Sequence, residues 1–336
     1  MGMYHYIVMN IRRFHSGDET DISNIYNESF SHWILNLGSK YEYFHISPTD
    51  VFAWLSKNSD GFDSIWITEN DGMIVGYVQC FLHSEKGEHE IKVLNISPND
   101  WTMGQSNLAV SVESRRNGIA SALLDFCEKF AFENGAKIII VQLFSDNIDA
   151  SRFLIQRGYI HNEFHYYSGY SESEPIACDS VYAYFDLSKE IPIIHYNDQI
   201  IVRPANLNDI NDLRILSILS ATWVDPTLFT EKWVRDYILG LFGNTVLVAE
   251  LDGRVVGAMD FIESRCRIGI AGVLPECRRM GIGYTLFHEL LKAMQIRGLD
   301  EAIADTGVTQ QDAIHMYERF GLEIKRRQHI WIKEVG

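Results

Sequence analysis

The chain has 336 residues and a formal net charge of −16, and 46% of its residues are hydrophobic. This length exceeds one ordinary core and suits two domains of a soluble globular protein. The acidic balance opposes nucleic-acid binding, which needs a basic surface. The sequence contains no run of 18 apolar residues, so we predict no membrane span. An acidic surface is compatible with a cationic substrate such as an amine, and equally with solubility alone.

Five cysteines are scattered along the chain without a CxxC pair. Such a set is typical of reduced thiols in the cytoplasm and offers no zinc-binding spacing, so we expect no metal. The N-terminal stretch MGMYHYIVMN lacks the basic, apolar and small-residue zones of a signal peptide. We therefore expect a cytoplasmic protein with neither a nucleic-acid nor a membrane partner.

Each half of the chain opens with a short β run and then a helix start. Residues 10–14 (NIRRF) lead to Asp21, and residues 201–205 (IVRPA) lead to Asp209. Both acids precede an amphipathic stretch, as an N-cap or a first-turn acid would. The two halves therefore begin alike.

A pair of strands follows in each half. The pairs cover residues 64–82 and 245–262, and they turn at Asp71-Gly72 and Asp252-Gly253. An Asp-Gly turn between β-rich runs is a strong hairpin signal. We predict one tight hairpin in each half.

The remaining elements continue the parallel order. A strand (107–112, 268–273) leads into a helix whose apolar residues recur at helical spacing, and Gly135 and Gly298 end these helices. A buried strand (136–144, 300–306) and a short helix (149–159, 312–322) come next. The predicted order in each half is β, α, hairpin, β, α, β, α, β, so the chain is an internal duplication.

The halves differ in length at two places. Residues 83–106 of the first half form a long connection in which EIKVLNI can be an extra strand. The first half ends in two β runs and the second in one, so we expect residues 188–198 to supply a missing edge strand to the second. The predicted boundaries are an N-terminal domain at 1–188, a linker at 189–198 and a C-terminal domain at 199–336.

One stretch recurs almost unchanged, as ESRRNGIASALL at 113–124 and ECRRMGIGYTLF at 276–287. In each copy glycines and arginines lie between a strand and a helix start. A helix N-terminus with unobstructed N–H groups and neighbouring arginines binds phosphate oxygens well. Neither a Walker loop nor the GxGxxG dinucleotide fingerprint is present. The pattern therefore predicts a pyrophosphate cradle in each half.

These two stretches resemble motif A of the GCN5-related N-acetyltransferases (GNAT), Arg/Gln-x-x-Gly-x-Gly/Ala. The resemblance covers essentially the whole chain. It implies two tandem GNAT folds of the α/β (α+β) class, each a mixed, mostly antiparallel twisted sheet with helices on both faces. It further implies that the loops bind the pyrophosphate of acetyl-coenzyme A (acetyl-CoA), beside a strand that pairs with the pantetheine arm. Carried over residue by residue, the cofactor contacts are Val273, Arg278, Arg279, Met280, Gly281, Ile282, Gly283, Val110, Arg115, Arg116, Asn117, Gly118, Ile119 and Ala120.

The copies diverge downstream, where the family pattern is Asn-x2-Ala-x3-Tyr-x3-Gly. The resemblance implies that the asparagine contacts pantetheine and that the tyrosine protonates the departing thiolate. The second copy has Gln310 and Tyr317, whereas the first has Asn147 and Leu154. Because leucine cannot donate a proton, we interpret the second copy as the catalytic one and the first as degraded, unless Tyr166 or Tyr167 replaces Leu154 in space.

The attacking amine must lose a proton, and a carboxylate on a central strand often serves as the base in this family. In the second copy the candidates are Asp260, Asp305 and Glu263. Asp260 lies in the hairpin, and Glu263 near a turn is better explained as a surface charge. We favour Asp305, since it ends the strand expected to open the thioester wedge.

These features predict an acetyl-CoA-dependent N-acetyltransferase, an acyltransferase for groups other than aminoacyl groups. It would transfer acetyl to a primary amine by direct attack, in the C-terminal domain. The alternative is a non-catalytic acyl-CoA-binding or regulatory tandem GNAT protein. The acceptor, a small molecule or a peptide amine, and the acyl-chain length stay open.

Overall fold

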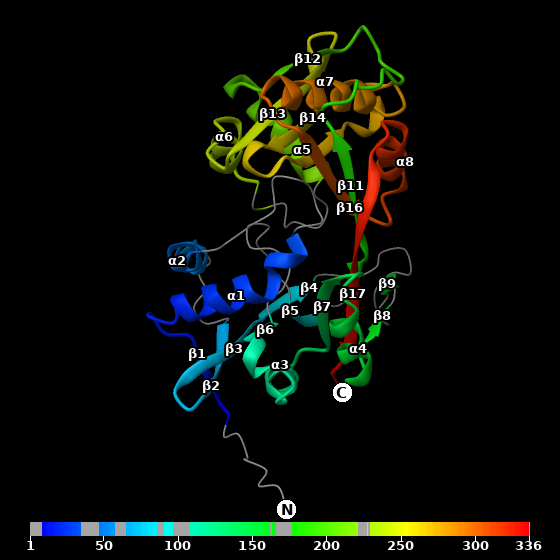
Figure 1. Cartoon of the computed structure of the whole chain (residues 1–336). Coiled ribbons are helices and arrows are strands. Elements are labelled where there is room, and N and C mark those ends of the chain that lie inside the picture. Colours follow the sequence, from blue (N-terminus) through cyan, green and yellow to red (C-terminus); the bar gives the residue numbers. More distant parts are fainter. Residues whose placement is uncertain are drawn as a thin grey trace, which may run out of the picture. The chain divides into compact units, whose positions relative to one another are not determined.

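The computed structural model describes residues 9–34, 47–57, 65–85, 91–96, 108–161, 163–165, 177–220, 227 and 229–335. The chain forms two compact units (Figure 1). The first unit comprises Met1–Ser180 with Arg326–Gly336, and the second comprises Val181–Lys325. In the described residues no helix is both long enough and apolar enough to cross a membrane.

Among the described residues, the first unit combines three groups of paired strands with four α-helices. Its strands are β1 (Asn10–Arg13), β2 (Ile65–Asn70), β3 (Met73–Gln79), β4 (Phe81–Glu85), β5 (Ile91–Ile96), β6 (Leu108–Val110), β7 (Ile138–Phe144), β8 (Ile160–His161), β9 (Phe164–His165), β10 (Ala177–Cys178) and most of β17 (Glu323–Glu334). Its α-helices are α1 (Glu19–Ile34), α2 (Pro48–Lys57), α3 (Ile119–Glu133) and α4 (Ile148–Gln156).

One sheet has the order β1-β2-β3-β6 and another runs β17-β7-β5-β4, while β9 and β10 form a separate pair. β5 lies within the predicted EIKVLNI segment, which confirms the extra strand. Apolar residues pack on both faces of the first sheet, with α1 and α2 over one face and α3 over the other.

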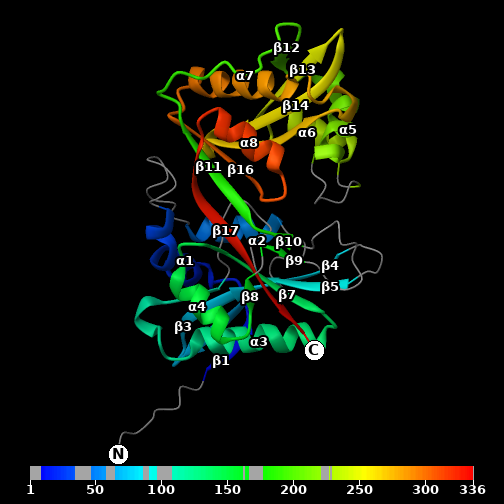
Figure 2. The same cartoon turned by 90° about the vertical axis from the view of Figure 1, so that its right-hand side faces the viewer.

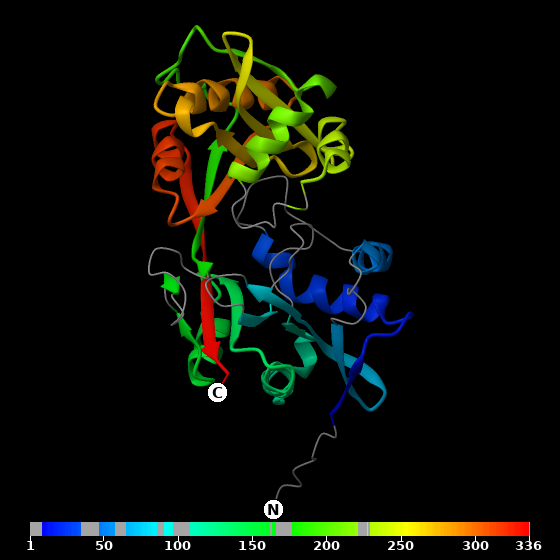
Figure 3. The ribbon, with the colours of Figure 1, turned by 180° about the vertical axis from the view of Figure 1, so that it is seen from behind.

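In the second unit the described strands follow one another in the order β12-β13-β14-β15-β16-β11. The strands are β11 (Ser180–Asp186), β12 (Ile201–Pro204), β13 (Asn244–Leu251), β14 (Arg254–Ile262), β15 (Arg267–Val273) and β16 (Glu301–Gly307). The helices α5 (Ile210–Ser220) and α6 (Glu231–Ile238) cover one face (Figure 3), and α7 (Ile282–Ile296) covers the other (Figure 1). The helix α8 (Gln311–Arg319) packs beside β16.

The strand expected from the linker comes from elsewhere, which corrects the prediction for residues 188–198. These residues form no strand. The last strand of the first half, β11, completes the sheet of the second unit beside β16. The last strand of the second half, β17, pairs with β7 in the first unit over Gln328–Glu334. Both are apolar β runs, and sequence patterns do not tell which sheet such a run will join.

Both predicted hairpins are confirmed. Asp71 and Gly72 have φ values of 50° and 77°, and Asp252 and Gly253 have 52° and 78°. Positive φ at both central residues defines the type I′ turn, whose twist matches that of the strands.

The helix ends that the glycines predict are also confirmed. Gly135 and Gly298 both have a φ of 75°, directly after the caps of α3 and α7. Six buried residues of α7 are those that helical spacing predicts, namely Ile282, Leu286, Phe287, Leu290, Leu291 and Met294.

A second matched feature lies at the start of each copy. Arg203 forms ion pairs with Asp209 at 2.8 Å and with Glu250 at 3.0 Å. The same network in the first unit joins Arg12 to Asp18 at 2.8 Å and to Glu69 at 2.7 Å. The structural counterpart of Asp209 is therefore Asp18, while Asp21 lies in the first turn of α1.

Candidate functional site

The two predicted phosphate loops have nearly identical backbones. Each begins with a 3₁₀ turn, at Val112–Ser114 in one and Pro275–Cys277 in the other. The second arginine of each loop is left-handed, with a φ of 66° at Arg116 and 64° at Arg279. The helix caps Gly118 and Gly281 have φ values of 80° and 82°. The two copies thus share the backbone conformation of the loop as well as its sequence pattern.

Both loops present an uncapped helix start. The first intrahelical bond of α7 runs from the Thr285 N–H to the Gly281 oxygen at 2.9 Å, and that of α3 runs from Ala122 to Gly118 at 3.0 Å. Neither cap glycine has a side chain that could accept the free N–H groups of the first helical turn that follows it. These donors, together with the helix dipole, favour an anion.

The first arginine of each loop turns back toward the preceding strand. The Arg115 Nε donates to the Val110 oxygen at 3.1 Å, and its Nη2 donates to Ser29 Oγ at 3.1 Å. The Arg278 Nε lies 3.4 Å from the Val273 oxygen in the equivalent bond. These side chains brace the loop against its strand in the conformation described here.

The strand before the loop separates from the next strand in the second unit. β15 and β16 pair in parallel at one position, Arg267 with Ile303. The part of β15 that leads to Val273 is thus unpaired on that side, among the described residues, and it offers backbone groups to an extended ligand. In the first unit β6, which ends at Val110, and β7 belong to different sheets.

The linker runs along α7 and ends on the second phosphate loop (Figure 2). Asn197 donates from Nδ2 to the Met280 oxygen at 2.9 Å and from its N–H to Thr285 Oγ1 at 3.0 Å. A Cβ at Gly281 would lie 2.6 Å from the His195 backbone oxygen. The position therefore requires glycine for close approach as well as for its φ.

The pantetheine-contact positions start the short helices. Asn147 caps α4, and its Oδ1 accepts the Ala150 N–H at 3.1 Å. Gln310 has a similar backbone at the start of α8 but makes no side-chain cap bond. The longer glutamine side chain is exposed.

Tyr317 is buried on α8, with 7% of its surface exposed. Its ring packs against Phe287 with centroids 5.5 Å apart. Burial, and then the charge of Asp305, hold the pKa of its phenol well above the usual range. Its counterpart Leu154 is equally buried on α4. Tyr166 and Tyr167 lie outside the described residues.

Asp305 is paired with Arg267 rather than open to the wedge. Arg267 donates from Nε to Oδ1 at 2.7 Å and from Nη2 to Oδ2 at 2.8 Å. Burial raises the pKa of Asp305, and Arg267 partly opposes that rise. Both carboxylate oxygens are occupied, so this geometry favours a structural ion pair.

Asp260 lies at a register irregularity of β14, and its side chain crosses to β15. Its Oδ1 accepts the Ile270 N–H at 2.5 Å, and a Cβ on Gly269 would lie 2.5 Å from the same oxygen. Only 3% of Asp260 is exposed. Burial raises its pKa to about 6, although interaction with the Tyr237 hydroxyl and the Ile270 N–H lowers it. A carboxyl with a pKa near 6 is poised to accept a proton near neutral pH.

The other carboxylate candidate is a surface group. Glu263 is about half exposed and forms an ion pair with Arg297 at 2.6 Å. This agrees with the interpretation of Glu263 as a surface charge.

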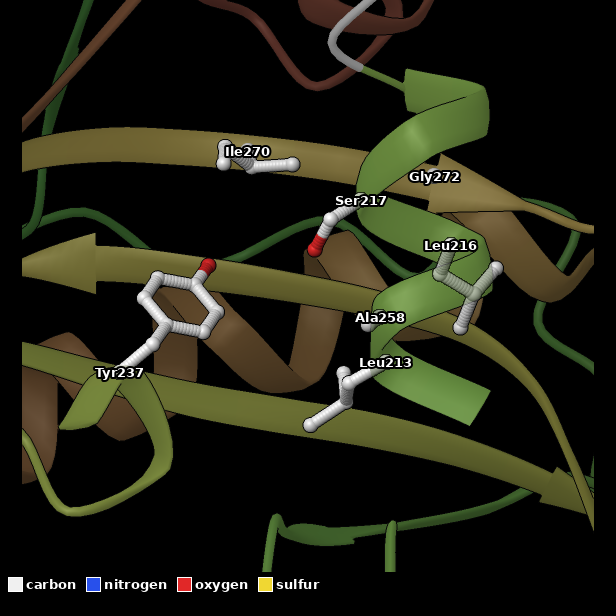
Figure 4. Close-up of a pocket in the computed structure, with 7 residues that line it drawn as sticks. All are labelled: Leu213, Leu216, Ser217, Tyr237, Ala258, Ile270 and Gly272. Atoms are coloured by element: carbon white, nitrogen blue, oxygen red, sulfur yellow. The ribbon is translucent and has the colours of Figure 1, made fainter. Parts of the chain in front are cut away.

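A small hollow lies beside Asp260, between α5, α6 and the sheet (Figure 4). The hydroxyl groups of Ser217 and Tyr237 point into it. The other lining residues are Leu213, Leu216, Ala258, Ile270 and Gly272. Sequence patterns did not single out Ser217 or Tyr237. Tyr237 lies one helical turn after Trp233 on α6, which follows an aromatic-rich stretch (223–233) that lies partly outside the described residues.

The two units differ at the positions of Asp260, Asp305 and Tyr317. A constant offset of 163 residues relates 112–158 to 275–321, which places Gln142 opposite Asp305 and Leu154 opposite Tyr317. Gly76 and Gly257 have matching neighbours, the first near Ile119 and Leu123 and the second near Ile282 and Leu286. Three residues after each glycine stand Gln79 and Asp260. The first unit therefore has no carboxylate or phenol at these positions.

The sheet order, the splayed strands and the two matching Gly/Arg loops define a duplicated acyltransferase fold. Residues 20–159 and 213–322 match the sequence profile of the acetyltransferase (GNAT) family. The chain belongs to this family, as two tandem GNAT domains.

Solved structures share the fold over nearly the whole chain. A tandem GNAT protein from the clavulanic acid biosynthesis pathway has a TM-score of 0.68 at 12% identity, covering 98% of this chain and 99% of that one. A GCN5-related N-acetyltransferase from Sphaerobacter thermophilus has a TM-score of 0.66 at 18% identity, with 97% and 96% covered. No curated protein sequence gave a significant match. At such identities the likeness concerns the fold alone.

Proposed function

We propose that this protein is an acetyl-CoA-dependent N-acetyltransferase whose chemistry takes place in the second unit. The observation that carries the proposal is the broken symmetry between the units. Two phosphate loops of equal backbone suit the same cosubstrate. The carboxylate and the phenol that acyl transfer would use, Asp260 and Tyr317, occur in the second unit and are Gln79 and Leu154 in the first.

In the proposed complex the first-turn N–H groups of α7 hold the pyrophosphate, with Arg279 beside them. The unpaired edge of β15 up to Val273 hydrogen-bonds the pantetheine arm. Acetyl-CoA, when bound, supplies the thioester carbonyl. The same loop and strand in the first unit, from Val110 to Ala120, are suited to a second coenzyme A molecule.

The ammonium group of the acceptor would lie at the mouth of the hollow lined by Ser217 and Tyr237, which itself has room for about one water molecule. This ammonium group loses a proton to the Tyr237 oxygen while Tyr237 passes its own proton to Asp260, and the neutral amine then attacks the carbonyl. Asp260 replaces Asp305 as the favoured base, since both oxygens of Asp305 are held by Arg267.

The thiolate of coenzyme A leaves as the tetrahedral intermediate collapses. Tyr317 would donate its phenol proton to the sulfur, and the second proton of the attacking nitrogen would pass through water to the Tyr317 oxygen as the amide forms. Burial keeps the pKa of this phenol above its ordinary value, so the oxygen carries its proton at neutral pH. A cytoplasmic location, where acetyl-CoA is available, is part of this proposal.

The test is release of coenzyme A thiol from acetyl-CoA with a panel of primary amines and amino-terminal peptides. Thiol release that saturates with one amine class, and that falls at least tenfold in Asp260→Asn with the fold intact, supports the proposal. Coenzyme A binding without turnover on any amine would favour the non-catalytic binding protein instead.

A further inference from the structure

Three potential metal ligands from distant parts of the sequence meet in the first unit. They are His161 at the end of β8, Asp179 between β10 and β11, and His329 in β17. The Asp179 Oδ2 lies 2.9 Å from the Nε2 of His161 and 3.9 Å from the Nε2 of His329. All three ligand atoms lie within 4.8 Å of one another. Neither phosphate loop includes these residues.

We propose that His161, Asp179 and His329 form a Zn²⁺ site with a fourth position open to water. Zn²⁺ binds imidazole nitrogen and carboxylate oxygen at roughly 2.0–2.2 Å in tetrahedral geometry. Such bonds place neighbouring ligand atoms about 3.4 Å apart. The separations of 2.9 and 3.9 Å lie on either side of this value. Two imidazoles with one carboxylate suit Zn²⁺ better than Mg²⁺ or Ca²⁺, which prefer oxygen ligands.

The carboxylate is already oriented for this role. Asp179 is buried, with 2% of its surface exposed. Its Oδ1 accepts the Ile330 N–H at 2.8 Å, which turns Oδ2 toward the two imidazole rings. A hydrogen bond of this kind fixes the direction of a metal ligand. A buried carboxylate also gains from a cation beside it.

The two imidazole rings are stacked side by side. Their ring centroids are 4.1 Å apart with an interplanar angle of 25°. A neutral imidazole keeps the lone pair that a metal needs. Without a metal, the Nε2 of His161, at 2.9 Å, would be the hydrogen-bond partner of the Asp179 Oδ2. The Nε2 of His329, at 3.9 Å, is too far away for a hydrogen bond to the same oxygen.

The position of the site suggests what the metal would do. The side chains of His161 and His329 are 32% and 23% exposed, so solvent can supply the fourth ligand. Asp179 immediately precedes the residue at which the chain leaves the first unit, and His329 belongs to the strand that returns to it. One ion would join both segments to β8. This proposal revises the expectation of no metal, which rested on cysteine spacing.

The test uses the full chain without a polyhistidine tag, freed of metal by a chelator. Zn²⁺ binding is then measured by competition with a chromophoric chelator. We expect one Zn²⁺ per chain and an affinity at least about 100-fold weaker in His161→Ala and in His329→Gln. The matched control is His315→Ala, an exposed histidine on α8, whose affinity stays within about twofold. Circular dichroism of the metal-free variants checks that each is folded.

Cobalt distinguishes this site from the buried thiols, of which Cys80 and Cys127 lie close together. The expected Co²⁺ spectrum has ligand-field bands and lacks a thiolate charge-transfer band. Less than about a tenth of an equivalent of Zn²⁺ bound, equal affinity in folded His161→Ala and His329→Gln variants, or a thiolate band would each overturn the proposal.

Discussion

Arg267 holds Asp305 through two parallel hydrogen bonds of 2.7 and 2.8 Å at the point where β15 and β16 still pair. Beyond this point the strands separate, so the ion pair lies at the closed end of the splay. Arg267 also lowers the pKa of Asp260 and of the Tyr317 phenol through its charge. The arginine therefore connects its structural partner Asp305 with Asp260 and Tyr317, the two residues that the proposed acyl transfer would use.

Removing the Asp305 charge should act on stability more than on chemistry. Asp305→Asn leaves the Arg267 guanidinium without its anion, and breaking a largely buried pair costs about 3 kcal/mol. We expect a lower midpoint of urea unfolding while kcat falls less than tenfold. A loss of turnover without a loss of stability would show that Asp305 is the base after all.

The Asp260→Asn variant should show the opposite pattern. Asn keeps an oxygen for the Ile270 N–H and removes a buried charge, so the free energy of unfolding at pH 7 should not decrease. Acyl transfer should fall by about 10²-fold, the usual contribution of a general base. Glu263→Gln at the surface is the matched control and should change neither quantity appreciably.

The pH dependence follows from the raised pKa of Asp260. Its carboxyl has a pKa of about 6 in the folded chain and an ordinary value of 3.8. The fold binds this proton more tightly than the unfolded chain does. The stabilisation by the protonated form is therefore complete below pH 3.8 and is lost as pH rises through 6, by about 3 kcal/mol in all. Urea unfolding of the wild type and Asp260→Asn across this range isolates the difference.

Activity should change with pH in the opposite direction to this stability term. The base must be ionised to accept a proton, so kcat/KM should rise from pH 5 to pH 7 with an apparent pKa near 6. Asp260→Asn should lose this limb of the profile. An unchanged limb in the variant would assign the titration to another group.

The phosphate loop offers a glycine pair for a controlled comparison. Gly281→Ala forces a left-handed alanine and places a Cβ 2.6 Å from the His195 oxygen. We expect a loss of about 2 kcal/mol in stability and weaker coenzyme A binding by calorimetry. Gly283→Ala, whose nearest neighbours are 4.0 Å away, should be tolerated, because the first copy already has Ala120 there. Equal effects of the two substitutions would contradict this explanation.

Local sequence signals predicted the local structure well. The Asp-Gly dipeptides gave both type I′ turns, and Gly135 and Gly298 gave both helix ends, because each of these backbones requires positive φ. The loop pattern around Gly118 and Gly281 likewise predicted two helix starts with a shared conformation. The domain boundaries and the roles of the predicted site residues stay predictions.

Contacts between residues far apart in the chain could not be predicted from the sequence, for a physical reason. Which sheet β11 and β17 would join depends on strand pairing, which their apolar patterns do not encode. The Asp305–Arg267 pair and the contact of Tyr237 with Asp260 bring together residues 38 and 23 positions apart. His161, Asp179 and His329 have no motif spacing at all. Only the folded sheet shows that these side chains are neighbours.

The most direct test of the central claim is steady-state thiol release by Tyr317→Phe compared with Gly118→Ala, using the best amine of the panel. Tyr317→Phe removes one hydroxyl from the second unit, and Gly118→Ala distorts the phosphate loop of the first. The account predicts that kcat falls by about 10²-fold in Tyr317→Phe and by less than threefold in Gly118→Ala, if both remain folded. Full activity in Tyr317→Phe with its loss in Gly118→Ala would place the chemistry in the first unit and contradict the account.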